Sequence, residues 1–196
     1  MGLAPVAFGM MGLTFGLFAY GLYLLGFEAK PLKEGAPDPA KTVASIGALS
    51  AFISLILMAI FQITTSPAAV DPAAAGPVGV ALTQLFSITP LMYALLWLTT
   101  VIVTWNGWDP RYLGNMALIV CIYQFIFMGI FHYLIGGVYD LNTGIIQIAL
   151  LTYALAALGF YLATHGKVPK FGGVICLWSG VMTFLLMLFP GGIVIM

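Results

Sequence analysis

The sequence predicts an all-α integral membrane protein, a bundle of six transmembrane helices that forms a single domain over residues 1–196. Of the 196 residues, 62% are hydrophobic and 6% are charged, whereas a soluble globular chain carries about 25% charge. Six stretches stay apolar over about the 20 residues that a helix needs to cross a bilayer. These runs are continuous, whereas a β-barrel requires short segments in which polar and apolar residues alternate.

Each predicted helix is bounded by residues that favour turns or break helices. In chain order, the helices are expected at about 3–27, 43–64, 78–104, 112–137, 143–163 and 172–195. The connections between them, rich in Pro, Gly, Asn, Asp and Lys, are expected at 30–39, 66–77, 106–110, 140–142 and 165–170.

The positions of the charges predict how the bundle is oriented. Every Lys and Arg follows an odd-numbered helix: Lys30, Lys33, Lys41, Arg111, Lys167 and Lys170. Loops rich in Lys and Arg stay in the cytoplasm, so both termini are expected on the outer side of a bacterial cytoplasmic (inner) membrane. The six positive and six negative charges cancel, which removes the basic field that nucleic-acid binding requires.

The helix interiors carry no Asp, Glu, Lys or Arg, and such residues are the usual parts of proton relays and ion-coupled pumps. His132 is the only candidate for a titrating group inside a span, and a histidine hydrogen-bonded at the interface is the more common situation. Cys121 and Cys176 are interpreted as small buried hydrophobes. With no nucleophile and base, metal cluster or cofactor motif visible, we expect no catalytic residue, no metal, no cofactor and no enzymatic activity.

Two helices carry aromatic residues at a spacing that places them on one face. Tyr93 and Trp97 are four residues apart on one helix, and Ala157 and Tyr161 follow Tyr153 one and two turns further along another. Residues at this spacing share a helix face. Aromatic walls with a few hydroxyls suit a small, flat, neutral polar molecule, although such strips more often serve helix packing.

The small residues Gly12 and Gly16 are four apart and predict close helix packing. The large uncharged polar residues of the spans are expected to face protein or water: Gln62, Gln84, Gln124 and Gln147.

Three short stretches near the predicted inner loops form a set of motifs. The first is LLG at 24–26, followed by DPAK at 38–41 and GALS at 47–50. The second is GWDPR at 107–111, and the third is KVPKF at 167–171 followed by SG at 179–180. These motifs resemble those of the family of proton-gated urea channels and short-chain amide transporters (AmiS/UreI family). Each motif is short, but their order and placement extend the resemblance over nearly the whole chain.

The resemblance implies a solute path through each protomer, a ring-shaped homo-hexamer in the lipid bilayer, and passive conduction of urea or short-chain aliphatic amides. Carried over by position, the path residues of the family fall on Tyr93, Trp97, Tyr153, Ala157, Ser179, Met10, Leu13 and Leu17. Ser179 stands where the family has an acidic residue, and Ala157 stands where it has a tryptophan. The outer loops hold Asp71 and Asp140 but no histidine cluster, which argues against acid gating.

A second hypothesis belongs to another class of protein. The missing carboxylate and the many Phe and Gly residues are also compatible with a structural or accessory subunit that packs against a larger membrane complex or binds lipid.

Overall fold

The computed structural model describes residues 5–27, 33–36 and 38–188, in which every regular element is a helix. The order is α1 (Pro5–Leu25), α2 (Pro39–Thr65), α3 (Pro67–Val70), α4 (Pro72–Asn106), α5 (Arg111–Leu134), α6 (Leu141–Thr164) and α7 (Pro169–Leu188). Six of these helices are long and apolar enough to cross a membrane, and α3 has only four residues. For the described residues, the predicted all-α bundle with six helices of membrane-spanning length is confirmed.

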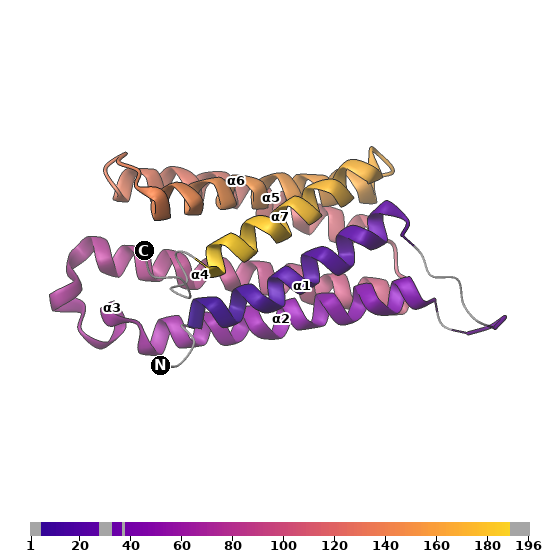
Figure 1. Ribbon diagram of the computed structural model, residues 1–196, viewed down its shortest axis with the longest axis horizontal. Helices are drawn as coiled ribbons and strands as arrows, with labels where there is room; N and C mark the ends of the chain where they lie inside the picture. Colours follow the sequence, from indigo (N-terminus) through magenta and orange to yellow (C-terminus); the bar gives the residue numbers. More distant parts are fainter. Residues whose placement is uncertain (1–4, 28–32, 37, 189–196) are drawn as a thin grey trace.

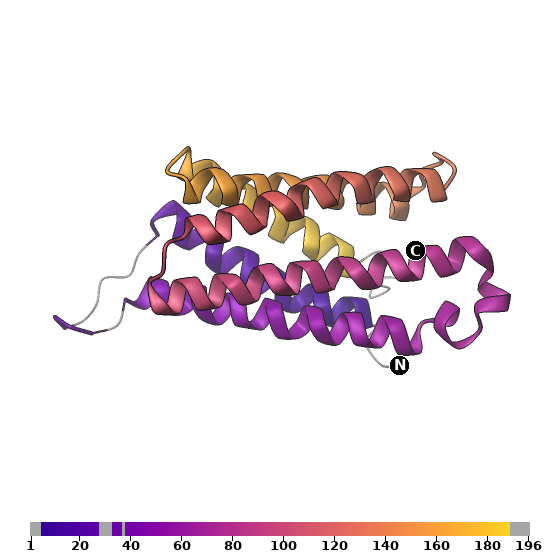
Figure 2. The ribbon, with the colours of Figure 1, turned by 180° about the vertical axis from the view of Figure 1, so that it is seen from behind.

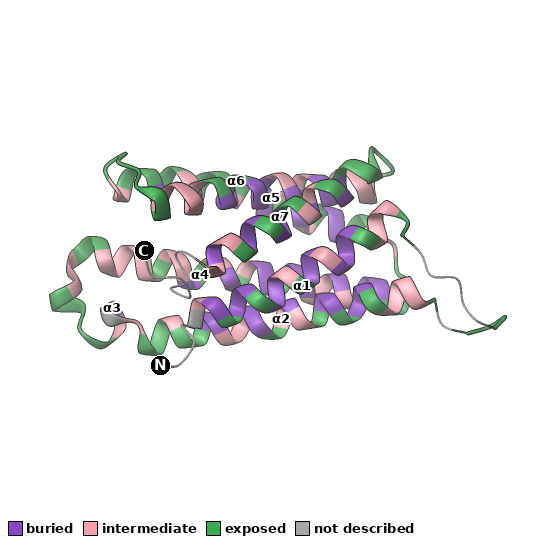
Figure 3. Ribbon diagram, in the orientation of Figure 1, coloured by how far each residue is buried: buried purple, intermediate pink, exposed green. Residues whose placement is uncertain are grey.

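The six long helices form a ring. Neighbours pack in the order α4, α2, α1, α7, α6, α5, and α5 returns to α4. In Figure 1, α1, α2 and α4 form one layer, the α5–α6 hairpin forms another, and α7 crosses obliquely between them. Figure 2 shows the same layers from behind, with α4 running along α2. Buried residues concentrate in the middle of the bundle, whereas residues 70–74, between α3 and the start of α4, are exposed (Figure 3). Several helices therefore share one interior.

The connections alternate between the two ends of the bundle. The α1–α2, α4–α5 and α6–α7 connections lie at one end, and α3 and the α5–α6 connection lie at the other (Figure 1). All Lys and Arg residues in the described part of the chain belong to the first end: Lys33, Lys41, Arg111, Lys167 and Lys170. We call this the basic end and the other the opposite end. Lys30 lies outside the described residues.

The segment 66–77, expected to be a connection, is largely helical, so that expectation was wrong. It contains α3 and the start of α4, with Gly76 alone in a non-helical, positive-φ conformation inside α4 (φ 67°). Proline is tolerated in the first turn of a helix because its missing N–H would have no partner there. Pro67 and Pro72 begin the two helices, and the Asp71 side chain accepts a hydrogen bond from the Ala74 N–H at 3.1 Å.

The other boundaries differ from expectation by a few residues. The fourth predicted helix was extended to 137, but α5 ends at Leu134 because Gly136 and Gly137 have positive φ. Asp38 and Asp140 cap the starts of α2 and α6. Asp38 accepts hydrogen bonds from the Ala40 and Lys41 N–H groups, and Asp140 accepts one from the Thr143 N–H. These carboxylates satisfy donors that a helix start leaves unpaired. The expected positions 3–4 and 189–195 lie outside the described residues.

The small residues predicted to allow close packing lie in the contact between α1 and α2. A Cβ atom added to Gly16 would lie 2.8 Å from Ala51 Cβ and 2.8 Å from the Gly47 carbonyl oxygen. A Cβ on Gly12 would collide with the Ser54 side chain. The two backbones therefore approach closely, which brings Met10, Leu13 and Leu17 of α1 into the interior, where all three are buried.

Candidate functional site

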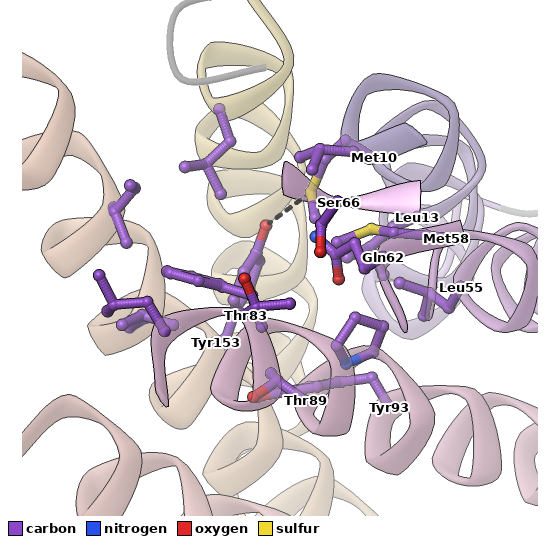
Figure 4. A pocket seen from close by; sticks show the side chains of 17 residues that line it. Met10, Leu13, Leu55, Met58, Gln62, Ser66, Thr83, Thr89, Tyr93 and Tyr153 are labelled. Atoms are coloured by element: carbon purple, nitrogen blue, oxygen red, sulfur yellow. Dashed lines mark hydrogen bonds between the residues drawn. The ribbon is translucent and has the colours of Figure 1, made fainter. Parts of the chain in front are cut away.

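A cavity of about 280 Å³ lies inside the ring, between α1, α2, α4, α6 and α7, in the half of the bundle toward the opposite end (Figure 4). Eleven of its seventeen lining residues are apolar, and none is charged. The lining residues are Val6, Met10, Leu13, Leu55, Met58, Gln62, Ser66, Leu82, Thr83, Phe86, Thr89, Pro90, Tyr93, Ile146, Leu150, Tyr153 and Leu186. We call this the outer cavity.

The outer cavity narrows at two tyrosines. The rings of Tyr93 on α4 and Tyr153 on α6 have their centroids 5.8 Å apart, and Leu13 of α1 lies beside them. These three residues also line a second cavity of about 10 Å³, which is about the space that one water molecule needs. We call this the inner cavity, and Leu17, Trp97 and Ala157 are among its walls.

An aromatic cluster lies beside the inner cavity, toward the basic end of the helices. The ring centroid of Tyr20 is 6.1 Å from that of Trp97 and 5.1 Å from that of Phe160. The Trp97 and Phe160 rings are perpendicular, with centroids 5.9 Å apart. All three side chains are at most 5% exposed. These three rings therefore pack against one another beside the inner cavity.

Seven of the eight residues expected on a solute path line one or both cavities. Met10, Leu13, Tyr93 and Tyr153 line the outer cavity, whereas Leu17, Trp97 and Ala157 line only the inner one. The i, i+4 spacing of each pair on α4 and α6 predicted that its members share a face. The structure adds that these two faces meet across the same narrow space.

Ser179, the eighth residue expected on the path, lines neither of these two cavities. It is fully buried, and its hydroxyl donates a hydrogen bond to the Thr152 carbonyl oxygen at 3.1 Å, which ties α7 to α6. One turn further, the Thr183 hydroxyl is 2.7 Å from the Tyr153 hydroxyl and donates to the Ser179 carbonyl at 2.6 Å. Thr183, which the sequence reasoning missed, therefore orients the hydroxyl of Tyr153.

Several buried polar atoms beside the cavities have no hydrogen-bond partner. They include the Tyr93 hydroxyl, the Trp97 indole Nε1 and the Gln62 side-chain carbonyl oxygen. An unpaired buried polar group costs about 1–3 kcal/mol, so each of these atoms would gain from a polar partner that can reach it. Gln124 is also buried without a partner, on α5, and lines neither cavity, whereas Gln84 is exposed.

His132 and Asp109 line neither of the two cavities. The His132 Nδ1 is 2.6 Å from the Tyr139 hydroxyl and the two rings stack, so this histidine is paired with a neighbour at the end of α5.

At the basic end, Asp109 forms an ion pair with Arg111, and hydrogen bonds from the Arg111 side chain and backbone lower the pKa of Asp109 to about 2. Among the described residues no group of three or more His, Cys, Asp or Glu is placed to hold a metal ion.

Sequence reasoning also missed Tyr20, Phe160 and Met58, and it named Gln62 only as a polar residue that should face protein or water. Tyr20 and Phe160 are aromatic residues on helices that already carried predicted path residues. Gln62 is a large polar residue in an apolar run, and such a residue must face protein or water. The sequence did not show how each helix is rotated about its axis, and so which of these side chains face the cavities.

The fold defines a class of protein in which six helices, each long and apolar enough to span a membrane, form a ring around an uncharged internal cavity. No family model, no curated protein and no solved structure matches the chain. The resemblance to the urea-channel and amide-transporter family therefore stays a prediction.

Proposed function

We propose that the protein is a passive channel or facilitator for small neutral polar solutes, with urea and short-chain aliphatic amides as the first candidates. The observation that carries this proposal is the uncharged outer cavity leading to the narrow space between Tyr93 and Tyr153. Seven residues expected on a solute path from their resemblance and spacing line this cavity or the next.

The chemistry of the walls favours a neutral solute. An ion that enters a pore must exchange its hydration shell for carbonyl oxygens or charged side chains, and the lining contains no charged residue. A planar neutral amide can stack on the tyrosine rings and hydrogen-bond to the Tyr93 hydroxyl or the Trp97 indole N–H, both of which lack partners. The uncharged path favours solutes without charge over ions and protons.

The proposed setting is the cytoplasmic membrane of a bacterium, with the basic end inside and both termini outside. Loops rich in Lys and Arg stay in the cytoplasm, and the described Lys and Arg residues all belong to the basic end. In this orientation the outer cavity faces the outside and the Tyr20 cluster closes the path toward the cytoplasm. We also propose a homo-oligomer, by resemblance a hexameric ring, with lipid on its outer surface.

Flux through reconstituted protein tests this function. Liposomes that contain the protein are mixed with urea, formamide or acetamide, and shrinkage and re-swelling are followed by light scattering. We expect faster re-swelling than in empty vesicles. In Trp97→Ala we expect the relative permeabilities of the three solutes to change. Cys121→Ala is the matched control, because Cys121 is equally buried on α5 and lines neither cavity. Permeability equal to that of empty vesicles for all three solutes would refute the proposal.

Purification in mild detergent tests the assembly. A homo-oligomer of this chain alone is expected. Other chains present in stoichiometric amounts would contradict this assembly and favour an accessory subunit of a larger membrane complex.

A further inference from the structure

We propose that the outer cavity is a lipid site that takes one acyl chain of a glycerophospholipid from the leaflet at the opposite end. The chain would fill the apolar part of the cavity, and its ester carbonyl oxygen would accept hydrogen bonds from the Ser66 and Thr83 hydroxyls. Binding of a lipid inside the helix ring goes beyond the proposed function and does not depend on it. The effect of such a lipid on solute flux does rest on that function.

Exposed aromatic residues on α5 indicate where the bilayer lies. Tyr112, near the start of α5, is 68% exposed, and Tyr133, near its end, is 82% exposed. These residues are 21 positions apart, which is about 31 Å along a helix. The hydrocarbon core of a bilayer is about 30 Å thick, and Tyr and Trp side chains gather at both of its interfaces. Tyr133 therefore marks the interface at the opposite end.

Ring contacts between α4 and α5 relate the cavity to this interface. The Phe86 ring on α4 packs against Phe127 and Phe131 on α5, with centroid distances of 5.9 and 5.8 Å. The two helices are antiparallel (Figure 2), so Thr83, three residues before Phe86, lies about 4.5 Å nearer to the opposite end. Tyr133 lies about 3 Å beyond Phe131 in the same direction. Thr83 and Tyr133 are thus at nearly the same depth.

The cavity extends from this interface to about the middle of the bilayer. Thr83 and Tyr93 lie toward its two ends and are ten residues apart on α4, which is about 15 Å along a helix and about half of the hydrocarbon core. Lining residues near Thr83, such as Ile146, are half-buried, whereas Leu13 and Leu55 are buried. The cavity therefore has the depth of one leaflet, and its mouth lies at the level of the lipid ester groups.

The volume of the cavity suits part of an acyl chain. An engineered apolar cavity of about 150 Å³ holds one benzene molecule. By the same measure, the outer cavity of about 280 Å³ has room for about twelve carbon atoms. A chain of this length spans a leaflet, as the cavity does.

The walls of the cavity suit a flexible apolar chain. Phe86, Leu55 and Leu150 contribute apolar surface from three helices, and Met10 and Met58 add thioether side chains that adapt to irregular shapes. The surrounding lipid is as apolar as these walls, so the gain does not come from leaving water. It comes from dispersion contacts that the walls lack when they face an empty space.

Two hydroxyls near the mouth are available to the ester group. Ser66, at the end of α2, and Thr83, on α4, are half-buried, and their side chains reach into the same part of the cavity (Figure 4). The Ser66 hydroxyl accepts a hydrogen bond from the Ala69 N–H at 3.2 Å, which leaves its own proton free to donate. The Thr83 hydroxyl donates to no other described residue. Both are uncharged donors, as an uncharged ester carbonyl oxygen requires.

A chain in this position would block the proposed solute path. It would occupy the outer cavity up to Tyr93 and Tyr153, where the cavity narrows. A solute and a chain cannot use this space together, so the lipid would regulate the channel by competing with its solute.

Photochemical labelling of the purified full chain in detergent tests the site. The probe is a phosphatidylcholine with a dodecanoyl chain that ends in a diazirine, and the labelled residues are identified by mass spectrometry. We expect labels on buried residues at the narrow end, Leu13, Tyr93 and Tyr153. Labels confined to the outer surface of the ring, for example to Ile119 and Ile126, would overturn the proposal.

A shorter probe tests the orientation of the chain. With a hexanoyl chain that ends in the same diazirine, the labels should move toward the mouth, to Phe86 and Ile146. The same labelling pattern for both chain lengths would overturn an ester group held at the mouth.

Two variants test the hydroxyls. Thr83→Val and Ser66→Ala each remove one donor, so each should lower labelling of the buried residues about five-fold when the probe is below saturation. Thr99→Val is the matched control, because Thr99 lies on the same helix as Thr83, is also half-buried and lines neither cavity. Unchanged labelling in both hydroxyl variants would overturn the position of the ester group.

Dodecanoic acid with the same terminal diazirine tests the source of the chain. We expect it to label the buried residues less than the phospholipid does, because a carboxylate at the mouth finds no charged partner in the lining. Equal or stronger labelling by the free acid would overturn the phospholipid assignment.

The flux assay separates this inference from the proposed function. Interior labelling without flux of any solute would refute the channel and leave the lipid site. Urea flux without interior labelling would refute the lipid site and leave the channel. If both are observed, added didodecanoyl phosphatidylcholine should slow urea flux several-fold compared with a phospholipid whose branched chains are too wide for the cavity. Equal flux with the two lipids would overturn the competition.

Discussion

Close packing of α1 on α2 makes a prediction about Gly16 that depends directly on the structure. A Cβ atom at Gly16 would lie 2.8 Å from Ala51 Cβ, whereas carbon atoms are most favourable at about 3.5–4.0 Å. Gly16→Ala must therefore separate the two helices locally by about 0.7 Å or more. Overpacking of this kind typically costs about 1–3 kcal/mol.

The matched control is Gly129→Ala on α5. A Cβ at Gly129 has no neighbour within 4 Å, so this substitution adds no steric conflict. Replacing glycine with alanine inside a helix is by itself favourable by about 0.8–1 kcal/mol, and this gain applies to both variants. The difference between them isolates the packing cost, and Gly16→Ala should be less stable than Gly129→Ala by about 1–3 kcal/mol.

The two buried cysteines provide the assay. Cys121 is 4% exposed and Cys176 is not exposed at all, and both are free thiols. A thiol-reactive fluorophore added during thermal or SDS denaturation therefore reports unfolding of the bundle. Gly16→Ala should label at a lower temperature or SDS fraction than Gly129→Ala. Equal stability of the two variants would refute the close approach of α1 and α2.

Three further predictions concern the inner closure, the hydroxyl network and the basic end. Tyr20→Ala removes a ring from the proposed closure and should raise solute flux several-fold in liposomes. Leu22→Ala should not, because Leu22 is 42% exposed on the same helix. Tyr153→Phe should lower stability by about 0.5–1.5 kcal/mol, measured by thiol labelling, because it breaks the bond to Thr183. Since the pKa of Asp109 is lowered to about 2, its ion pair stabilises the fold above the unfolded pKa of about 3.9, and this contribution disappears as pH falls toward 2. Asp109→Asn should flatten that part of the stability–pH curve, and high salt should weaken the effect because the pair is exposed.

Helix content and number could be predicted because they depend on local properties of the chain. A run of about 20 apolar residues has few alternatives to a helix in a bilayer, where every backbone polar group must be paired within the element. The proline-rich segment 66–77 was the exception. There the local signals of Pro and Gly predicted a connection, but Pro67 and Pro72 start helices and the break is confined to Gly76.

The candidate site could be predicted only in part. The spacing of Tyr93 and Trp97 placed both residues on one face of α4, and the resemblance paired that face with Tyr153 and Ala157. All four residues line the inner cavity. The role of Ser179 depended on its rotation about the α7 axis, and its hydroxyl faces the Thr152 carbonyl. The aromatic character of Tyr20 was visible in the sequence, but its contact with Trp97 was not, because the spans contain many aromatic residues.

By itself, the sequence determined the environment of the protein, the number and approximate ends of its long helices, and the segregation of its positive charges. Composition and local periodicity are sufficient for these features. The tertiary structure alone decided that the ring encloses a cavity of about 280 Å³, that Tyr93 and Tyr153 narrow it, and that Tyr20 packs beside the narrow part. These features arise from contacts between helices distant in sequence, and the close approach permitted by Gly12 and Gly16 sets the position of α1 among them.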